Sequence, residues 1–91
     1  MSKSAHRLGD PNSAGAAIVE IIQPDVYING ILASIDGCPV AGHGPGEHAG
    51  PVTADGSPTV FIHNIPANRD GDSDSCGHPR AGGSSDVFIG P

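Results

Sequence analysis

Cysteine and histidine side chains gather in two short glycine- and proline-rich stretches of this 91-residue chain. One runs from Cys38 through His43 to His48, and the other is Cys76-Gly-His78-Pro. Thiolate sulfur and neutral imidazole nitrogen are the ligands that zinc prefers, and a structural zinc site takes four of them. The glycines and proline between His43 and His48 allow both rings to converge on one ion, and the glycine between Cys76 and His78 permits a tight chelate. The predicted metal site is therefore His43, His48, Cys76 and His78.

Other readings of these residue types stay open at this point. The spacing is not that of a standard zinc finger, and loop histidines are often only solvated. Cys38 is a rival thiol ligand, a disulfide partner or a small buried residue. We expect His6 to be exposed in the N-terminal tail, and His63 to form a turn because it stands where an earlier repeat has Asn29. Glu47 could accept a hydrogen bond from a ligand imidazole, or be solvated.

Catalytic interpretations are weaker, and we predict no catalytic residue. The run Asp-Gly-Asp-Ser-Asp at residues 70–74 resembles the start of a calcium loop, but Ala81 occupies the twelfth position, where a bidentate Glu is required. Cys76 and His78 could form a nucleophilic pair. A chain this small and rich in glycine and proline offers no enclosed pocket for a small-molecule substrate.

Composition predicts a small domain that needs a staple. The chain contains 14 glycines and 9 prolines, only three aromatic residues other than histidine, and no Trp. A core this thin is usually supported by a disulfide, a metal or a partner. The formal net charge of −6, with four Lys and Arg in total, excludes the basic patch that nucleic-acid binding requires. No apolar run approaches the roughly 20 residues of a membrane span.

A repeated unit organises the chain. Residues 24–33 recur as residues 58–67 and again, shortened, as residues 85–91, each with the pattern Val-aromatic-Ile followed by a turn. β-Branched and aromatic side chains favour a strand, in which residues two apart share a face. One face is therefore expected to carry the aliphatic pairs and the other the aromatic side chains, which are Tyr27, Phe61 and Phe88.

Turn residues follow the strand pattern. Asn29-Gly30 is a strong signal for a two-residue hairpin loop, and His63-Asn64 stands at the same place in the second repeat. The β-branched run at residues 18–22 ends before a proline and predicts a further strand rather than a helix. We expect an all-β fold of three short hairpin units with almost no helix, in one domain over residues 1–91, with residues 1–5 as a flexible tail.

The repeats resemble the PAAR-repeat proteins. The resemblance is carried by residues 7–11 (Arg-Leu-Gly-Asp-Pro), 56–62 (Gly-Ser-Pro-Thr-Val-Phe-Ile) and 83–90 (Gly-Ser-Ser-Asp-Val-Phe-Ile-Gly). Residues 66–69 (Pro-Ala-Asn-Arg) are similar to the family's Pro-Ala-Ala-Arg. Many members have a histidine near the position of Ala14, so His78 would have to complete the ligand set here.

The resemblance implies a cone with one zinc ion near its apex, held by three histidines and one cysteine, with iron as an alternative ion. It implies a structural, membrane-piercing tip that caps the blunt end of a trimeric β-helical spike, one copy per trimer. We expect transient contact with a target outer membrane and no nucleic-acid partner. Without the spike, the exposed base should make the protein associate or precipitate.

The machine is expected to be contractile. The run at residues 76–80 (Cys-Gly-His-Pro-Arg) resembles phage tips, and we expect no toxin domain beyond the repeats. Both points favour a phage baseplate, and a type VI secretion spike is the alternative. The protein would be made in the cytoplasm and then sit at the virion tail tip, or leave the cell as part of a secretion spike. Hypotheses from other classes are a free-standing zinc-binding module and a cysteine-based enzyme.

Overall fold

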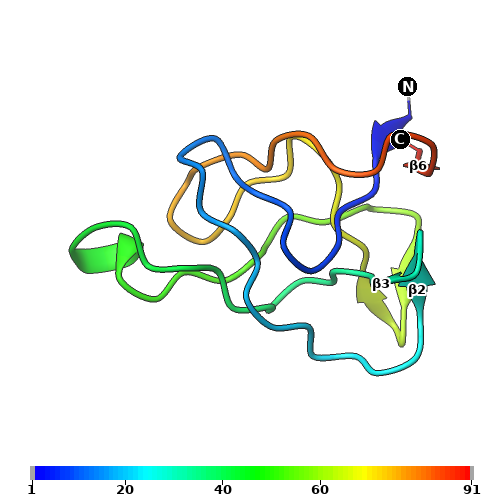
Figure 1. Ribbon diagram of the computed structural model, residues 1–91, viewed down its shortest axis with the longest axis horizontal. Coiled ribbons are helices and arrows are strands. Elements are labelled where there is room, and N and C mark those ends of the chain that lie inside the picture. The colour runs from blue at the N-terminus through cyan, green and yellow to red at the C-terminus, as the bar shows by residue number, and fades with distance from the viewer. Residues whose placement is uncertain (1, 91) are drawn as a thin grey trace.

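Short antiparallel strands joined by long loops make up the computed structural model, which describes residues 2–90. The elements are β1 (Lys3–Ser4), β2 (Tyr27–Ile28), β3 (Ile31–Leu32), a 3-10 helical turn η1 (Gly46–His48), β4 (Phe61–Ile62), β5 (Ile65–Pro66) and β6 (Phe88–Ile89). The strands gather at the broad end of the molecule, and the loop that carries η1 projects from the opposite, narrower end (Figure 1). The nearly all-β cone expected from the sequence is confirmed.

Two of the three hairpins are closed by loops that require positive φ. β2 pairs with β3 across Asn29 and Gly30, whose φ angles are 56° and 75°. β4 pairs with β5 across His63 and Asn64, whose φ angles are 53° and 65°. Positive φ at both central residues matches the twist of short antiparallel strands, and Asn and Gly tolerate it best. The predicted turns are therefore confirmed.

The third hairpin is assembled from the two ends of the described chain. β6 pairs with β1, so that Lys3 lies opposite Ile89 and Ser4 opposite Phe88. The N-terminal segment thus supplies the strand that pairs with the third copy of the repeat. The prediction of a flexible tail over residues 1–5 is wrong for residues 3–5, because they are paired with other segments and Ala5 is fully buried. Met1 lies outside the described residues.

A closed ring of backbone hydrogen bonds joins the three repeats. Residues 5–7, 33–35 and 67–69 form this central ring, in which each segment bridges the other two. The amide of His6 donates to the carbonyl of Asn68 (3.1 Å), Asn68 donates to Ser34 (3.0 Å), and Ser34 donates to His6 (2.9 Å). The ring has pseudo-threefold symmetry although its three central residues differ.

The central ring buries polar side chains. Ser34 Oγ hydrogen-bonds Asn68 Oδ1, and Asn68 also donates to Asp36. His6 is fully buried, and neither of its ring nitrogens has a hydrogen-bond partner among the described residues. The expectation that His6 is exposed is therefore wrong, because its segment is the third side of the ring rather than a tail.

Each hairpin is preceded by a buried side chain that caps its backbone. Gln23 Oε1 accepts hydrogen bonds from the amides of residues 25 and 26. Ser57 Oγ does the same for residues 59 and 60, and Ser84 Oγ for residues 86 and 87. These bonds orient the strands without a large core. The repeats are therefore held as much by polar contacts as by apolar packing.

Apolar packing is limited to two small clusters. One consists of Ala16, Ile18, Ile35, Cys38 and Val40, and the other of Ala5, Ala67 and Ile89. The strand predicted at residues 18–22 is wrong. Within this stretch only Ile18 makes a bridge, to Val40, and residues 19, 20 and 22 are exposed.

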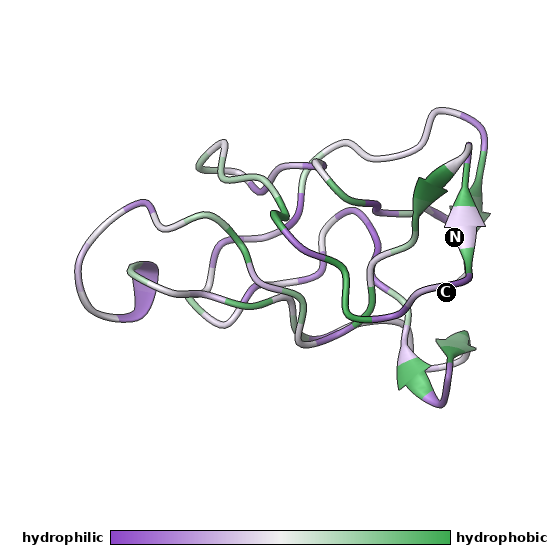
Figure 2. Ribbon diagram, turned by 60° about the horizontal axis from the view of Figure 1, so that its bottom comes forward, coloured by the Kyte–Doolittle hydropathy of each residue, from purple (hydrophilic) through white to green (hydrophobic). Residues whose placement is uncertain are grey.

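The aromatic residues of the hairpins face outward. Tyr27, Phe61 and Phe88 are 58%, 52% and 54% exposed, and they occupy the same place in β2, β4 and β6. Figure 2 shows hydrophobic colour on the strands at the end near the two termini, except on β1 (Lys3–Ser4), and hydrophilic colour on η1. Among residues 2–90, no helix has the length and apolar character to cross a bilayer.

Candidate metal centre

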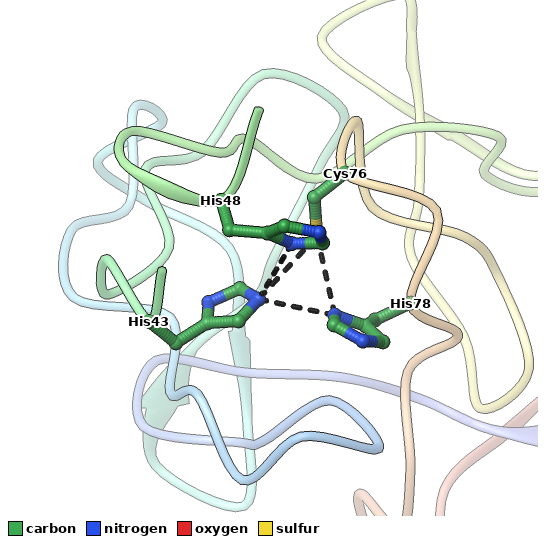
Figure 3. A group of neighbouring side chains, drawn as sticks. All are labelled: His43, His48, Cys76 and His78. Carbon is green, nitrogen blue, oxygen red and sulfur yellow. Dashed lines mark hydrogen bonds between the residues drawn. The ribbon is translucent and has the colours of Figure 1, made fainter. Parts of the chain in front are cut away.

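Two loops bring the candidate ligands together (Figure 3), and the one that carries η1 forms the narrow end of the molecule (Figure 1). The first loop covers residues 41–49 and returns on itself, because the amide of His43 donates to the carbonyl of His48 at 2.8 Å. Glycine is required for this close return, since a Cβ on Gly42 would lie 2.5 Å from the carbonyl oxygen of Ala49. η1 then places the ring of His48 toward that of His43.

The second loop covers residues 74–80. The amide of Asp74 donates to the carbonyl of His78 at 2.9 Å, and the amide of Gly77 donates to the carbonyl of Asp74 at 2.8 Å. Gly77 has a φ of 93°, which an L side chain rarely adopts. The tight turn at Gly77 brings Cys76 and His78 to the same side of the loop.

The four ligand atoms form a compact group. Nε2 of His43 lies 3.0 Å from Nδ1 of His78 and 3.2 Å from Nδ1 of His48. Sγ of Cys76 lies 3.7 Å from the same His43 nitrogen and 3.6 Å from Nδ1 of His78. Across the whole group, the ligand atoms lie within 4.8 Å of one another.

These distances fit a tetrahedral metal site. Zinc bound at about 2.05 Å to nitrogen and about 2.3 Å to sulfur sets tetrahedral edges of about 3.3 Å between nitrogens and about 3.6 Å between sulfur and nitrogen. Four of the six separations, at 3.0–3.2 Å and 3.6–3.7 Å, are close to these values, and the other two are at most 4.8 Å. The group could therefore bind a metal ion, and its donor set is one that zinc favours.

A backbone carbonyl orients the ring of His43. Nδ1 of His43 lies 3.0 Å from the carbonyl oxygen of Ala41. A carbonyl oxygen can only accept, so Nδ1 carries the proton and Nε2 presents its lone pair to the centre of the group. Ala41 thus makes the contact that the sequence analysis considered for Glu47, whose side chain is exposed in η1. A fixed tautomer of this kind is typical of metal-bound imidazoles.

The remaining candidates lie elsewhere. Cys38 is a free thiol, fully buried in the apolar cluster around Ile35. His6 lies in the central ring, as described above. His63 forms the β4–β5 turn, and its Nε2 lies 2.6 Å from the carboxylate of Asp25.

The acidic run at residues 70–74 does not provide a calcium site. Both oxygens of Asp72 are engaged by the side chain of Arg69, and Asp74 is paired with Arg80 at 2.9 Å. These carboxylates neutralise buried guanidinium groups instead of converging on a cation.

Sequence reasoning missed the importance of Asp74 and Arg80. Both side chains are fully buried and stand at the two ends of the second metal loop. Arg80 ends the Cys-Gly-His-Pro-Arg run, but nothing in its spacing from Asp74 predicts an ion pair. The two residues become neighbours only because the loop between them folds back on itself. Asn12, 62 residues from Asp74, donates to the same carboxylate.

Fold and site together define a class: a small β cone of three hairpin units with a closed three-histidine, one-cysteine cluster. The sequence matches the PAAR motif family over residues 41–91, more than half of the chain. The protein therefore belongs to the PAAR motif family, as the repeats indicated. The family match indicates a structural role at the spike tip of a contractile injection system.

One curated relative is a far larger protein. The chain is 37% identical over 69 residues to the double-stranded DNA deaminase toxin A of Burkholderia cenocepacia (strain H111). The alignment covers 72% of this chain and 5% of the relative. The chain thus corresponds to about one-twentieth of that toxin.

Proposed function

We propose that this protein is the membrane-piercing tip that caps the blunt end of a trimeric β-helical spike, one copy per trimer. The observation that supports this most directly is the set of half-exposed aromatic residues Tyr27, Phe61 and Phe88. They occupy equivalent places on three hairpins that lie at the end opposite the metal loops (Figure 1). A single chain with this pseudo-threefold base is complementary to a threefold partner.

The strand edges of the base would add to the docking. Each hairpin has only two strands, so each leaves outer backbone groups without a strand partner in the described part of the chain. Open edges of this kind pair readily with another chain. A spike whose strands end at the base would cover both the edges and the aromatic rings.

We propose that His43, His48, Cys76 and His78 hold one structural zinc ion, with iron as the alternative. When bound, the ion would tie the loop of the second repeat to that of the third. Small structural zinc sites contribute about 10–16 kcal/mol to folding, more than the usual net stability of a domain. This would stiffen the narrow end against the load of tail contraction, at the point of transient contact with the target outer membrane.

Four protein ligands close the proposed site, and an open position for water or substrate is what catalytic zinc sites keep. The proposed role is therefore structural and not enzymatic, with no small-molecule substrate or nucleic acid as partner. The deaminase activity in the name of the curated relative is not proposed for this chain, which matches 5% of that protein.

Two contractile machines are candidates for the spike that this tip would cap. The Cys-Gly-His-Pro-Arg run at residues 76–80 resembles phage tips and supports a contractile phage baseplate, with the protein at the virion tail tip. The similarity to a bacterial toxin supports the second candidate, a type VI secretion spike tip that leaves the cell with its spike.

The test is to mix the purified protein with trimeric spike fragments from a phage baseplate and from a type VI system, and to weigh the complexes by native mass spectrometry. We expect one copy per trimer on one of the two fragments, and association or precipitation of the protein alone. A stable monomer at high concentration that binds neither fragment would refute the proposal.

A further inference from the structure

The two loops of the metal centre are anchored very differently. In the described part of the chain, residues 42–49 make backbone hydrogen bonds only with one another, whereas Ala41, the first residue of the loop, donates to the carbonyl of Ala17 at 2.9 Å. Gly44, Gly46 and Glu47 are exposed. Residues 74–80, by contrast, are joined to two distant segments, residues 10–16 and residues 52–53. Beyond Ala41, the first loop therefore depends on itself for its shape, whereas the second loop is part of the core.

The anchor of the second loop is the ion pair between Asp74 and Arg80. Nη2 of Arg80 donates to Oδ2 of Asp74 at 2.9 Å, and both side chains are fully buried. The pair joins the residues just before and just after the turn that carries Cys76 and His78. The backbone adds a bond of 2.7 Å from the amide of Arg80 to the carbonyl of Asp72. The ends of the loop are thus held at a fixed separation.

The same guanidinium reaches into the first repeat. Nη1 of Arg80 donates to the carbonyl of Asp10 at 3.0 Å, and Nη2 also donates to the carbonyl of Ala16 at 3.2 Å. Asn12 donates to Oδ2 of Asp74 at 3.0 Å. The planar guanidinium holds several N–H donors at fixed angles, so one arginine side chain can hydrogen-bond acceptors on two segments. The single ammonium group of a lysine cannot reproduce this geometry.

The second repeat holds the loop from the other side. The backbone of Asp74 pairs with that of Thr53 in an isolated antiparallel β-bridge, and the amide of Ser75 donates to the carbonyl of Val52 at 2.8 Å. The backbone that precedes Cys76 is therefore fixed by contacts that involve none of the four candidate ligands.

We propose that the Asp74–Arg80 pair positions Cys76 and His78 before any metal binds, so that metal binding mainly closes the loop of His43 and His48 onto a preformed half-site. This inference rests on the proposed metal site. Preforming two ligands lowers the ordering cost of binding, because only one loop must be fixed by the ion. Asp74 and Arg80 are positioning residues, since neither is a proposed ligand.

The chain offers a matched control. Arg69 and Asp72 form a second buried ion pair in the same repeat, at 2.7 Å, but the Arg69 side chain bonds only Asp72 in its own turn. Arg80→Lys and Arg69→Lys keep the charge and remove the fork in each case. Only Arg80→Lys releases the ends of the metal loop.

The experiment first counts zinc on the wild-type protein, then measures the zinc dissociation constant of each variant by competition with a chromophoric chelator. We expect Arg80→Lys to weaken zinc binding by about 10- to 100-fold, and Arg69→Lys by less than about threefold. The visible spectrum of the cobalt(II)-substituted protein should show a distorted site only in Arg80→Lys. Equal zinc affinity in Arg80→Lys and wild type, or equal losses in both variants, would overturn the inference.

A measurement on the wild type covers the case in which Arg80→Lys does not fold. Amide hydrogen exchange of the zinc-free protein should leave the amides of Asp74 and Gly77 as protected as that of Ser34 in the central ring. The amides of His48 and Ala49 should exchange much faster. Fast exchange at Asp74 and Gly77 would refute preformation even if the spike-capping proposal holds, and a wild type that binds no metal would refute both this inference and the proposed zinc site.

Discussion

The exposed aromatic ring of Phe61 gives the sharpest test of the proposed base. A fully covered aromatic side chain buries about 150–250 Å². Phe61 is 52% exposed, so about 100 Å² of it remains to be covered by a partner. At about 25 cal/mol per Å², covering this area contributes about 2.5 kcal/mol to the binding free energy. Phe61→Ala should therefore raise the dissociation constant for the spike about 60-fold.

The assay is isothermal titration of the zinc-loaded variant into the trimeric spike fragment that captures the wild type. The metal loops lie at the opposite end from β4 (Figure 1), so the substitution should not touch zinc binding directly. A variant that keeps one zinc ion per chain is therefore folded. Val19→Ala is the matched control, since Val19 is 58% exposed but stands outside the hairpins.

Two results would refute the reasoning. If Phe61→Ala binds the spike within about twofold of wild type, the aromatic face is not the docking surface. If Val19→Ala loses as much affinity as Phe61→Ala, the loss reflects general apolar contact and not a threefold base.

Three further predictions concern the metal, the pH and the backbone. His43→Ala should lose the bound zinc in elemental analysis and unfold at a lower denaturant concentration. Cys38→Ala should keep one zinc ion and lose only about 1 kcal/mol of unfolding free energy in the same two measurements. Burial, with Arg80 nearby, lowers the pKa of His6 below 6.5, so its contribution to stability is complete above pH 6.5 and is lost as the pH falls through the folded-state pKa. His6→Asn should therefore flatten the decline of the unfolding free energy between about pH 7.5 and 5. In denaturation experiments, Gly83→Ala should lower the unfolding free energy by about 1–3 kcal/mol more than Gly82→Ala. A Cβ at Gly83 would lie 2.7 Å from atoms of Ala5 and His6, whereas a Cβ at Gly82 would meet nothing within 4 Å.

The pH prediction needs a histidine control, because the chain has four histidines besides His6. His63→Asn removes an exposed imidazole from a turn where the first repeat already has Asn29. It should leave the pH profile of stability steep at equal zinc saturation. A profile unchanged by His6→Asn would show that the buried ring does not account for the acid sensitivity.

Local features of the sequence determined the hairpins and the candidate ligand set. Asn29-Gly30 and His63-Asn64 could be identified as turns because positive φ is a local demand that few residues meet. Residue type, and the glycines that allow tight turns, likewise predicted the two loops that carry His43, His48, Cys76 and His78. Metal affinity of that group stays a prediction until zinc is counted.

Long-range pairing was decided only by the tertiary structure. Nothing in Lys3–Ser4 favours a strand, and β1 forms where the two ends of the described chain close on each other and it pairs with β6. The same closure buries His6 in the central ring, and the loop at residues 74–80 makes neighbours of Asp74 and Arg80. Composition and periodicity report what a segment favours by itself, whereas these contacts depend on which distant segment completes the backbone hydrogen bonds, and that is fixed when the three repeats close on one another.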